Sequence, residues 1–81
     1  MKLDVAEKDT KEYLAEAENI LKAHGVCTLV GKSRDTVKAV DIAEELKLKG
    51  FSIGVITLHT ESVGPENEKR NISILSIEVK K

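Results

Sequence analysis

The sequence has little of several residue types on which particular functions depend. Cys27 is the one cysteine among 81 residues, so an intrachain disulfide and a zinc site built from cysteine pairs are excluded. Tyr13 and Phe51 are the only aromatic residues, which argues against RNA binding by base stacking on a sheet. No apolar run approaches the roughly 18 residues that cross a bilayer, and Met1–Val5 has no signal-peptide core. These absences predict a cytoplasmic protein without membrane contact.

The sequence also lacks an excess of charge of either sign. Lys and Arg total 13 and Asp and Glu total 14, which gives a net charge of −1. Charged residues make up 33% and hydrophobic residues 41% of the chain, a balance typical of a globular protein. With no linker or repeat in between, residues 1–81 form one predicted domain. A net charge near zero is a poor total for a nucleic-acid binder, which is usually basic.

Hydrophobic periodicity predicts the first half of the chain as strand, helix, strand, helix. Residues 2–5 alternate as a short strand. An amphipathic helix follows over about 10–24, with Asp9 as a possible N-cap in a capping box and Gly25 as its C-terminal stop. The apolar run 26–30 indicates a strand buried on both faces. A second helix ends at Gly50, with Glu44–Lys47 and Glu45–Lys49 spaced as ion pairs.

The pattern of residues 51–81 predicts two antiparallel strands. Alternation over 51–58 changes phase at Ile56, which suggests a bulge, and residues 63–68 carry a loop signal. Residues 72–79 form the last strand, so a long hairpin is expected. The order predicts an α/β (α+β) fold, β-α-β-α-β-β, with a four-stranded mixed sheet and two helices on one face. The other face would be solvated, covered by a ligand or paired with a second subunit.

The segment Lys32-Ser33-Arg34 is locally basic at the predicted start of the second helix. Unpaired backbone N–H groups and the helix dipole favour phosphate at such a position. Arginine can hold a phosphate with two hydrogen bonds, whereas lysine acts as a point charge. The alternative is an ordinary solvated loop in which Ser33 or Asp35 caps the helix.

No arrangement of residues predicts catalysis. Cys27 lies in an apolar strand and is expected in the core, and His24 lies in the last helical turn, where the dipole favours a cation. His59 has no expected carboxylate partner, and Glu44 and Glu45 diverge by about 100° on a helix. We therefore predict no enzyme, no catalytic residue, no metal ligand, no cofactor and no small-molecule substrate.

Three segments together resemble the Alba family of archaeal chromatin and RNA-binding proteins. Lys32-Ser33-Arg34 followed by Lys38-Ala39-Val40-Asp41 is similar to the family's basic loop and second helix. Residues 72–81 resemble its final strand and basic tail, and Tyr13 with Lys8 ahead of it is a third match. The resemblance implies a homodimer with hairpin arms that binds double-stranded DNA or structured RNA, associated with the nucleoid if the ligand is DNA.

The resemblance also implies which side chains meet the nucleic acid. A basic body surface would lie on the phosphate backbone while the arms reach toward the minor groove. Carried over by position, the nucleic-acid-binding residues are Lys8, Lys32, Ser33, Arg34, Lys38 and Lys47 on the body and Lys69 and Arg70 on the arm.

Acidic residues at some of these places lead to a second hypothesis. Glu7 stands where the family often has a lysine, and the arm contains Glu61, Glu66 and Glu68. A chain with this balance could be an assembly subunit with little nucleic-acid affinity of its own. It would then form a heterodimer with a more basic paralogue or join an RNA–protein complex.

Overall fold

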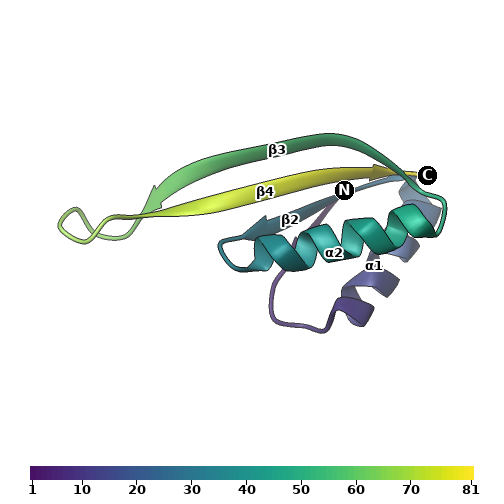
Figure 1. Ribbon diagram of the computed structural model, residues 1–81, viewed down its shortest axis with the longest axis horizontal. Helices are drawn as coiled ribbons and strands as arrows, with labels where there is room; N and C mark the ends of the chain where they lie inside the picture. The colour runs from purple at the N-terminus through teal and green to yellow at the C-terminus, as the bar shows by residue number, and fades with distance from the viewer.

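The protein, a computed structural model covering residues 1–81, consists of two helices and four strands (Figure 1). In chain order they are β1 (Lys2–Val5), α1 (Thr10–His24), β2 (Val26–Lys32), α2 (Asp35–Leu48), β3 (Ser52–Val63) and β4 (Arg70–Lys80). The sheet order is β1-β2-β4-β3; β1 is parallel to β2, and β4 is antiparallel to both of its neighbours. Both helices lie on one side of the sheet (Figure 1). The predicted four-stranded mixed sheet of an α+β fold is confirmed. Neither helix is long and apolar enough to cross a membrane.

One hydrophobic core lies between the two helices and the sheet. Helical spacings of three and four residues bring the apolar side chains of α1 and α2 onto the sheet-facing side of each helix. Alternation in β2 and β4 does the same for the sheet, and Cys27 is fully buried there as predicted. Burial raises the pKa of the Cys27 thiol. The core consists of Val5, Tyr13, Ala17, Leu21, Cys27, Leu29, Ala39, Ile42, Ala43, Leu46, Ile77 and Val79.

The helix ends agree with the sequence in position but only partly in mechanism. Helix α1 begins after Asp9, yet the Asp9 side chain makes no capping hydrogen bond, so the capping box does not form. Gly25 ends α1 with a φ of 79°, and its N–H donates to the Leu21 carbonyl. The alternative in which Ser33 or Asp35 caps α2 is not seen, because Arg34 occupies the N-cap position with helical φ and ψ and makes no side-chain capping hydrogen bond.

Strands β3 and β4 form a hairpin longer than the sequence indicated. They pair from Ser52 opposite Lys80 to Val63 opposite Arg70, and the irregularity between Ile53 and Ile56 confirms the predicted bulge. The distal part of the hairpin extends beyond the helices (Figure 1), which makes the molecule 46 Å long but only 24 Å and 19 Å across. Polar side chains beyond Leu58 weaken the strand signal, because neither face of this part is buried.

The ion pairs predicted within α2 do not form. Neither Glu44–Lys47 nor Glu45–Lys49 is within ion-pair distance, whereas the Lys49 ammonium lies 2.9 Å from the Glu18 carboxylate of α1. A carboxylate on the neighbouring helix therefore takes the place of one on the same helix. The contact ties the C-terminal end of α2 to α1.

Candidate nucleic-acid interface

The basic loop, Lys32-Ser33-Arg34, connects β2 directly to α2. Lys32 is the last residue of β2 and Arg34 is the N-cap residue of α2. Both side chains are exposed, and neither forms an ion pair with a carboxylate. The first turn of a helix also presents backbone N–H groups without intrahelical partners. Arg34 thus lies at the positive end of a helix, and Lys32 lines an adjoining hollow with Asp4 and Glu61 without pairing to either, an arrangement that offers a phosphate two unpaired cations.

Two contacts fix the position of the basic loop on the body. Ser33, at a φ of 53°, donates its backbone N–H to the Ser73 carbonyl of β4 at 2.8 Å. Immediately before the loop, Gly31 lies against the start of α2 so closely that a Cβ there would be 2.6 Å from the Asp35 carbonyl oxygen. The same Cβ would be 3.0 Å from the Cβ of Ala39. A strand end packed this tightly on a helix start holds the backbone of the basic loop in place.

Lys8, the second predicted contact, is paired with an acid of its own chain. Its ammonium lies 2.9 Å from the Glu16 carboxylate and 5.8 Å from the centroid of the Tyr13 ring. The hydrogen bond to Glu16, with the charge of that carboxylate, raises the pKa of Lys8. Sequence reasoning missed this partner because Lys8 precedes α1, so its spacing to Glu16 matches no helical pair.

Lys38 has a different environment from every other predicted contact. The residue is half-buried, and its ammonium donates to the main-chain carbonyls of Ala6 at 2.8 Å and of Lys8 at 2.9 Å. It forms no ion pair. Lys38 follows Arg34 by four residues and therefore lies one turn further along the same side of α2. The structure thus brings Lys8 and Lys38 together near the basic loop.

The remaining predicted residues lie away from this cluster. Lys47 is exposed 13 residues after Arg34, about 20 Å along the helix axis. Lys69 and Arg70 lie at the tip of the hairpin, together with Glu66 and Glu68. The eight predicted residues therefore form three separate groups on one chain, with Lys47 alone on the body.

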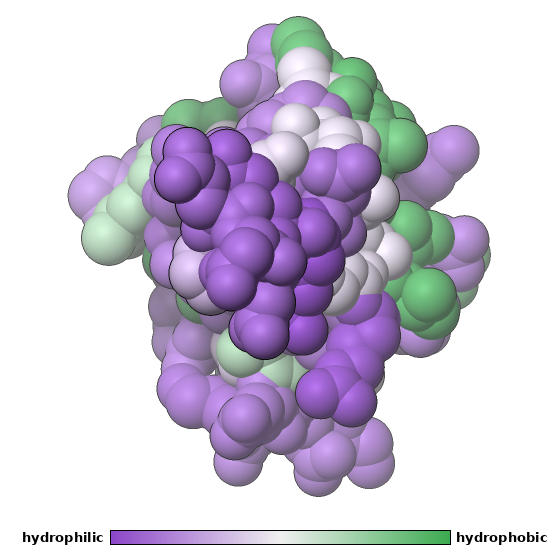
Figure 2. Space-filling model, turned by 90° about the vertical axis from the view of Figure 1, so that its left-hand side faces the viewer, coloured by the Kyte–Doolittle hydropathy of each residue, from purple (hydrophilic) through white to green (hydrophobic).

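An exposed apolar surface, which the sequence pattern did not separate from the core, lies across α2 and β3. Val37 and Val40 are 65% and 37% exposed, and Ile56 and Leu58 are 57% and 68% exposed; we call these four the apolar patch. Two shallow hollows of about 300 and 380 Å³ border it, both reaching Leu75 of β4. Figure 2 shows hydrophobic surface mainly along one flank, whereas the hairpin tip is hydrophilic.

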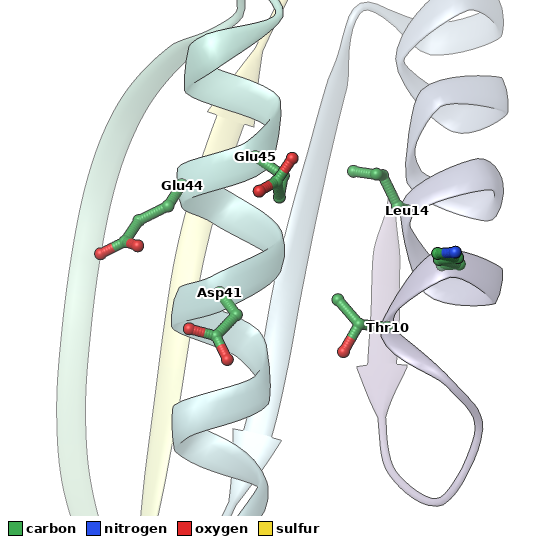
Figure 3. Close-up of a pocket in the computed structure, with 6 residues that line it drawn as sticks. Thr10, Leu14, Asp41, Glu44 and Glu45 are labelled. Carbon is green, nitrogen blue, oxygen red and sulfur yellow. The ribbon is translucent and has the colours of Figure 1, made fainter.

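A groove of about 480 Å³ between the two helices carries mostly acidic groups. Asp41, Glu44 and Glu45 of α2 line it opposite Thr10, Lys11 and Leu14 of α1. In Figure 3 Glu45 points toward α1 and Glu44 toward β3, which confirms that the two carboxylates diverge. This groove has the charge opposite to that of the basic loop.

No group of three or more His, Cys, Asp or Glu side chains is arranged to hold a metal ion. His59 does have a carboxylate neighbour, contrary to expectation: its Nε2 lies 3.4 Å from Glu61. Residues two apart on a strand share one face, so strand geometry explains the contact. Both side chains are exposed on the hairpin, and no nucleophile lies with them.

Comparison with known proteins identifies structures that share this fold. No family model and no curated protein sequence matches the chain. Among solved structures, Alba from Thermoplasma volcanium superposes with a TM-score of 0.85 and 22% identity over 100% of both chains. ALBA1 from Trypanosoma brucei superposes with a TM-score of 0.84 and 14% identity, over 99% of this chain and 68% of that one. The predicted resemblance thus holds in three dimensions: the chain has the fold of the Alba proteins.

Proposed function

We propose that the protein is a dimeric nucleic-acid-binding protein whose main phosphate contact is the basic loop. The loop geometry carries the proposal: Lys32 and Arg34 are exposed and unpaired at a helix start, on a backbone fixed by Gly31 and Ser33. The Alba fold and the resemblance of the loop to that family's basic loop support it. The role is binding to the phosphate backbone of duplex DNA or structured RNA, without a catalytic step.

A variant with reversed charge in the basic loop tests the phosphate contact. We expect the double change Lys32→Glu and Arg34→Glu to abolish mobility shifts of duplex DNA and duplex RNA at about 50 mM salt. Lys11→Glu with Lys22→Glu on α1 is the matched control, because it changes net charge equally at exposed positions outside the proposed site. Equal loss in both variants would mean that total charge, and not the loop, determines binding.

We further propose that the apolar patch is where a second copy of the chain packs. The patch combines two elements, is flanked by the two hollows and leaves Leu58 more than two-thirds exposed. A stable interface buries about 800 Å² per partner, and a small domain without disulfides gains stability from self-association. A two-fold dimer would present the basic loop twice, so a phosphate backbone could meet two locally basic sites on a protein whose net charge per chain is −1.

The dimer is tested by placing a charge in the patch. Leu58→Glu should convert the dimer to a folded monomer in a mass measurement, because Leu58 is exposed within the single chain and the core does not need it. Ala23→Glu, at an exposed site on α1, should leave the mass unchanged. A wild-type chain that is monomeric at micromolar concentration would contradict the dimer.

The Lys8–Glu16 pair favours a second candidate function, that of an assembly subunit. A cation neutralised within the chain adds little to phosphate binding, and the hairpin tip carries acids beside Lys69 and Arg70. A more basic paralogue could supply the missing positive charge. In that case the chain alone would show no shift at about 50 mM salt, while a mixture with such a partner would form a heterodimer that binds.

A further inference from the structure

The segment Ala6–Asp9 between β1 and α1, which we call the Lys8 segment, is held from both sides by side chains. On one side the Lys38 ammonium of α2 donates to the carbonyls of Ala6 and Lys8, at 2.8 and 2.9 Å. On the other side the Tyr13 hydroxyl accepts the N–H of Ala6 at 2.8 Å and that of Lys8 at 3.4 Å. The same two residues thus have both their donors and their acceptors satisfied by side chains from two helices.

This geometry limits what Lys38 can offer to a phosphate. A lysine ammonium has three N–H donors, and two of them are directed at main-chain carbonyls of its own chain. Hydrogen bonds from a charged group are stronger than neutral ones, and leaving their acceptors unpaired is costly. Lys38 is also half-buried, whereas Lys32 and Arg34 are exposed. Direct phosphate binding by Lys38 would therefore compete with the contacts that hold the Lys8 segment.

The consequence for Lys8 follows from its place in the segment. Its backbone is fixed by Lys38 and Tyr13, and its side chain crosses the Tyr13 ring toward Glu16. The direction in which the Lys8 ammonium leaves the body is thus set by two residues that come later in the chain. Removing the Lys38 ammonium would remove both hydrogen bonds that join the Lys8 segment to α2.

We propose that Lys38 is a positioning residue, which fixes the Lys8 segment to α2 and so places Lys8 for nucleic acid beside the basic loop. This inference rests on the proposed function. It assigns to Lys38 a role other than the phosphate contact that the sequence predicted. Its charge still adds to the local positive potential, because no carboxylate is paired with it.

The test compares Lys38→Met, Lys8→Met and the double variant in salt titrations of duplex DNA binding. If Lys38 acts through Lys8, the double variant binds no more weakly than Lys38→Met alone. The log–log salt slope of the dimer then falls by about 1.8, for two phosphate contacts at about 0.9 each, in each of the three variants. If Lys38 binds a phosphate directly, the losses add and the slope of the double variant falls by about 3.6. Additive losses would overturn the inference.

Amide hydrogen exchange supplies the structural readout. Lys38→Met should speed exchange at the N–H of Ala6 and Lys8 roughly tenfold or more, with α1 and β2 unchanged. Unchanged exchange in the Lys8 segment would overturn the inference. Lys22→Met, an exposed lysine on α1, is the control and should alter neither exchange nor binding.

Tyr13→Phe is the second variant, and it remains informative if Lys38→Met does not fold. It removes the hydroxyl that accepts from the opposite side of the Lys8 segment and leaves Lys38 in place. If Lys38 positions Lys8, Tyr13→Phe should weaken DNA binding. If Lys38 contacts the phosphate directly, Tyr13→Phe should leave DNA binding unchanged, so unchanged binding would count against the positioning role. Absence of binding by the wild-type chain at about 50 mM salt would refute the proposed function itself.

Discussion

At the scale of single residues, the basic side chains differ in what surrounds them. Lys32 and Arg34 are unpaired, the Lys8 ammonium meets a carboxylate, and the Lys38 ammonium meets two carbonyls. A phosphate approaching Lys32 or Arg34 has no ion pair to break, although Lys32 shares a hollow with Asp4 and Glu61. At Lys8, in contrast, it must displace Glu16. The same residue type therefore contributes unequally to binding, and net charge is a poor guide to it.

Glu16→Gln tests the competition at Lys8. The amide leaves Lys8 without its ion pair, so a phosphate no longer has to displace a carboxylate and affinity for duplex DNA should rise by about a factor of a few. The pKa of Lys8 should move back toward its ordinary value, because the hydrogen bond and charge of Glu16 are what raise it. Glu18→Gln, which removes the partner of Lys49 instead, is the matched control. An equal gain in both variants would show that only net charge had changed.

Gly31→Ala tests the support of the basic loop. The added Cβ would meet backbone at the Asp35 carbonyl, which cannot move away alone. We expect a loss of about 1–3 kcal/mol in the free energy of unfolding, measured by urea denaturation, together with weaker DNA binding.

Gly54→Ala is the control for that prediction. The Cβ added there would meet the end of the Glu78 side chain, which can rotate away. Its cost should therefore be small. Gly31→Ala with wild-type stability would mean that the strand end and α2 are not packed as described.

At the scale of elements, most of the fold followed from periodicity and the rest did not. Both helices and the bulge near Ile56 were predictable. The spacing of apolar residues reflects which face is buried, and glycines mark where the helices end. The length of β3 beyond Leu58 was not, since that part has no buried face. The basic loop was found as a local run of charge, whereas the contacts of Lys8 and Lys38 join residues up to 32 positions apart and needed the structure.

The distal part of the β3–β4 hairpin can be deleted without changing any residue of the core. Replacing Ser62–Asn71 by Asn-Gly would close Glu61 and Ile72, which face each other, with a two-residue turn. Thermal stability should change little, because the removed residues are mostly exposed. Binding to duplex DNA should weaken through loss of Lys69 and Arg70. Unchanged affinity would restrict the interface to the body.

At the scale of the whole molecule, acidic and basic side chains are only partly separated on the surface. Asp41, Glu44 and Glu45 line the groove between the helices. The basic loop instead lies at the junction of β2 and α2, where Lys32 lines a hollow with Asp4 and Glu61. A dimer through the apolar patch would double the number of basic loops without adding net positive charge. Weak, strongly salt-dependent binding is the expected behaviour of such a surface.

The most direct test of the account is the salt dependence of duplex DNA binding by the wild-type dimer and by Lys32→Gln with Arg34→Gln. We predict a log–log slope that is negative in the wild type. The slope should be shallower by about 3.6 in the variant, for four cations lost per dimer at about 0.9 each. Equal slopes for the two proteins would contradict the claim that the basic loop binds phosphate.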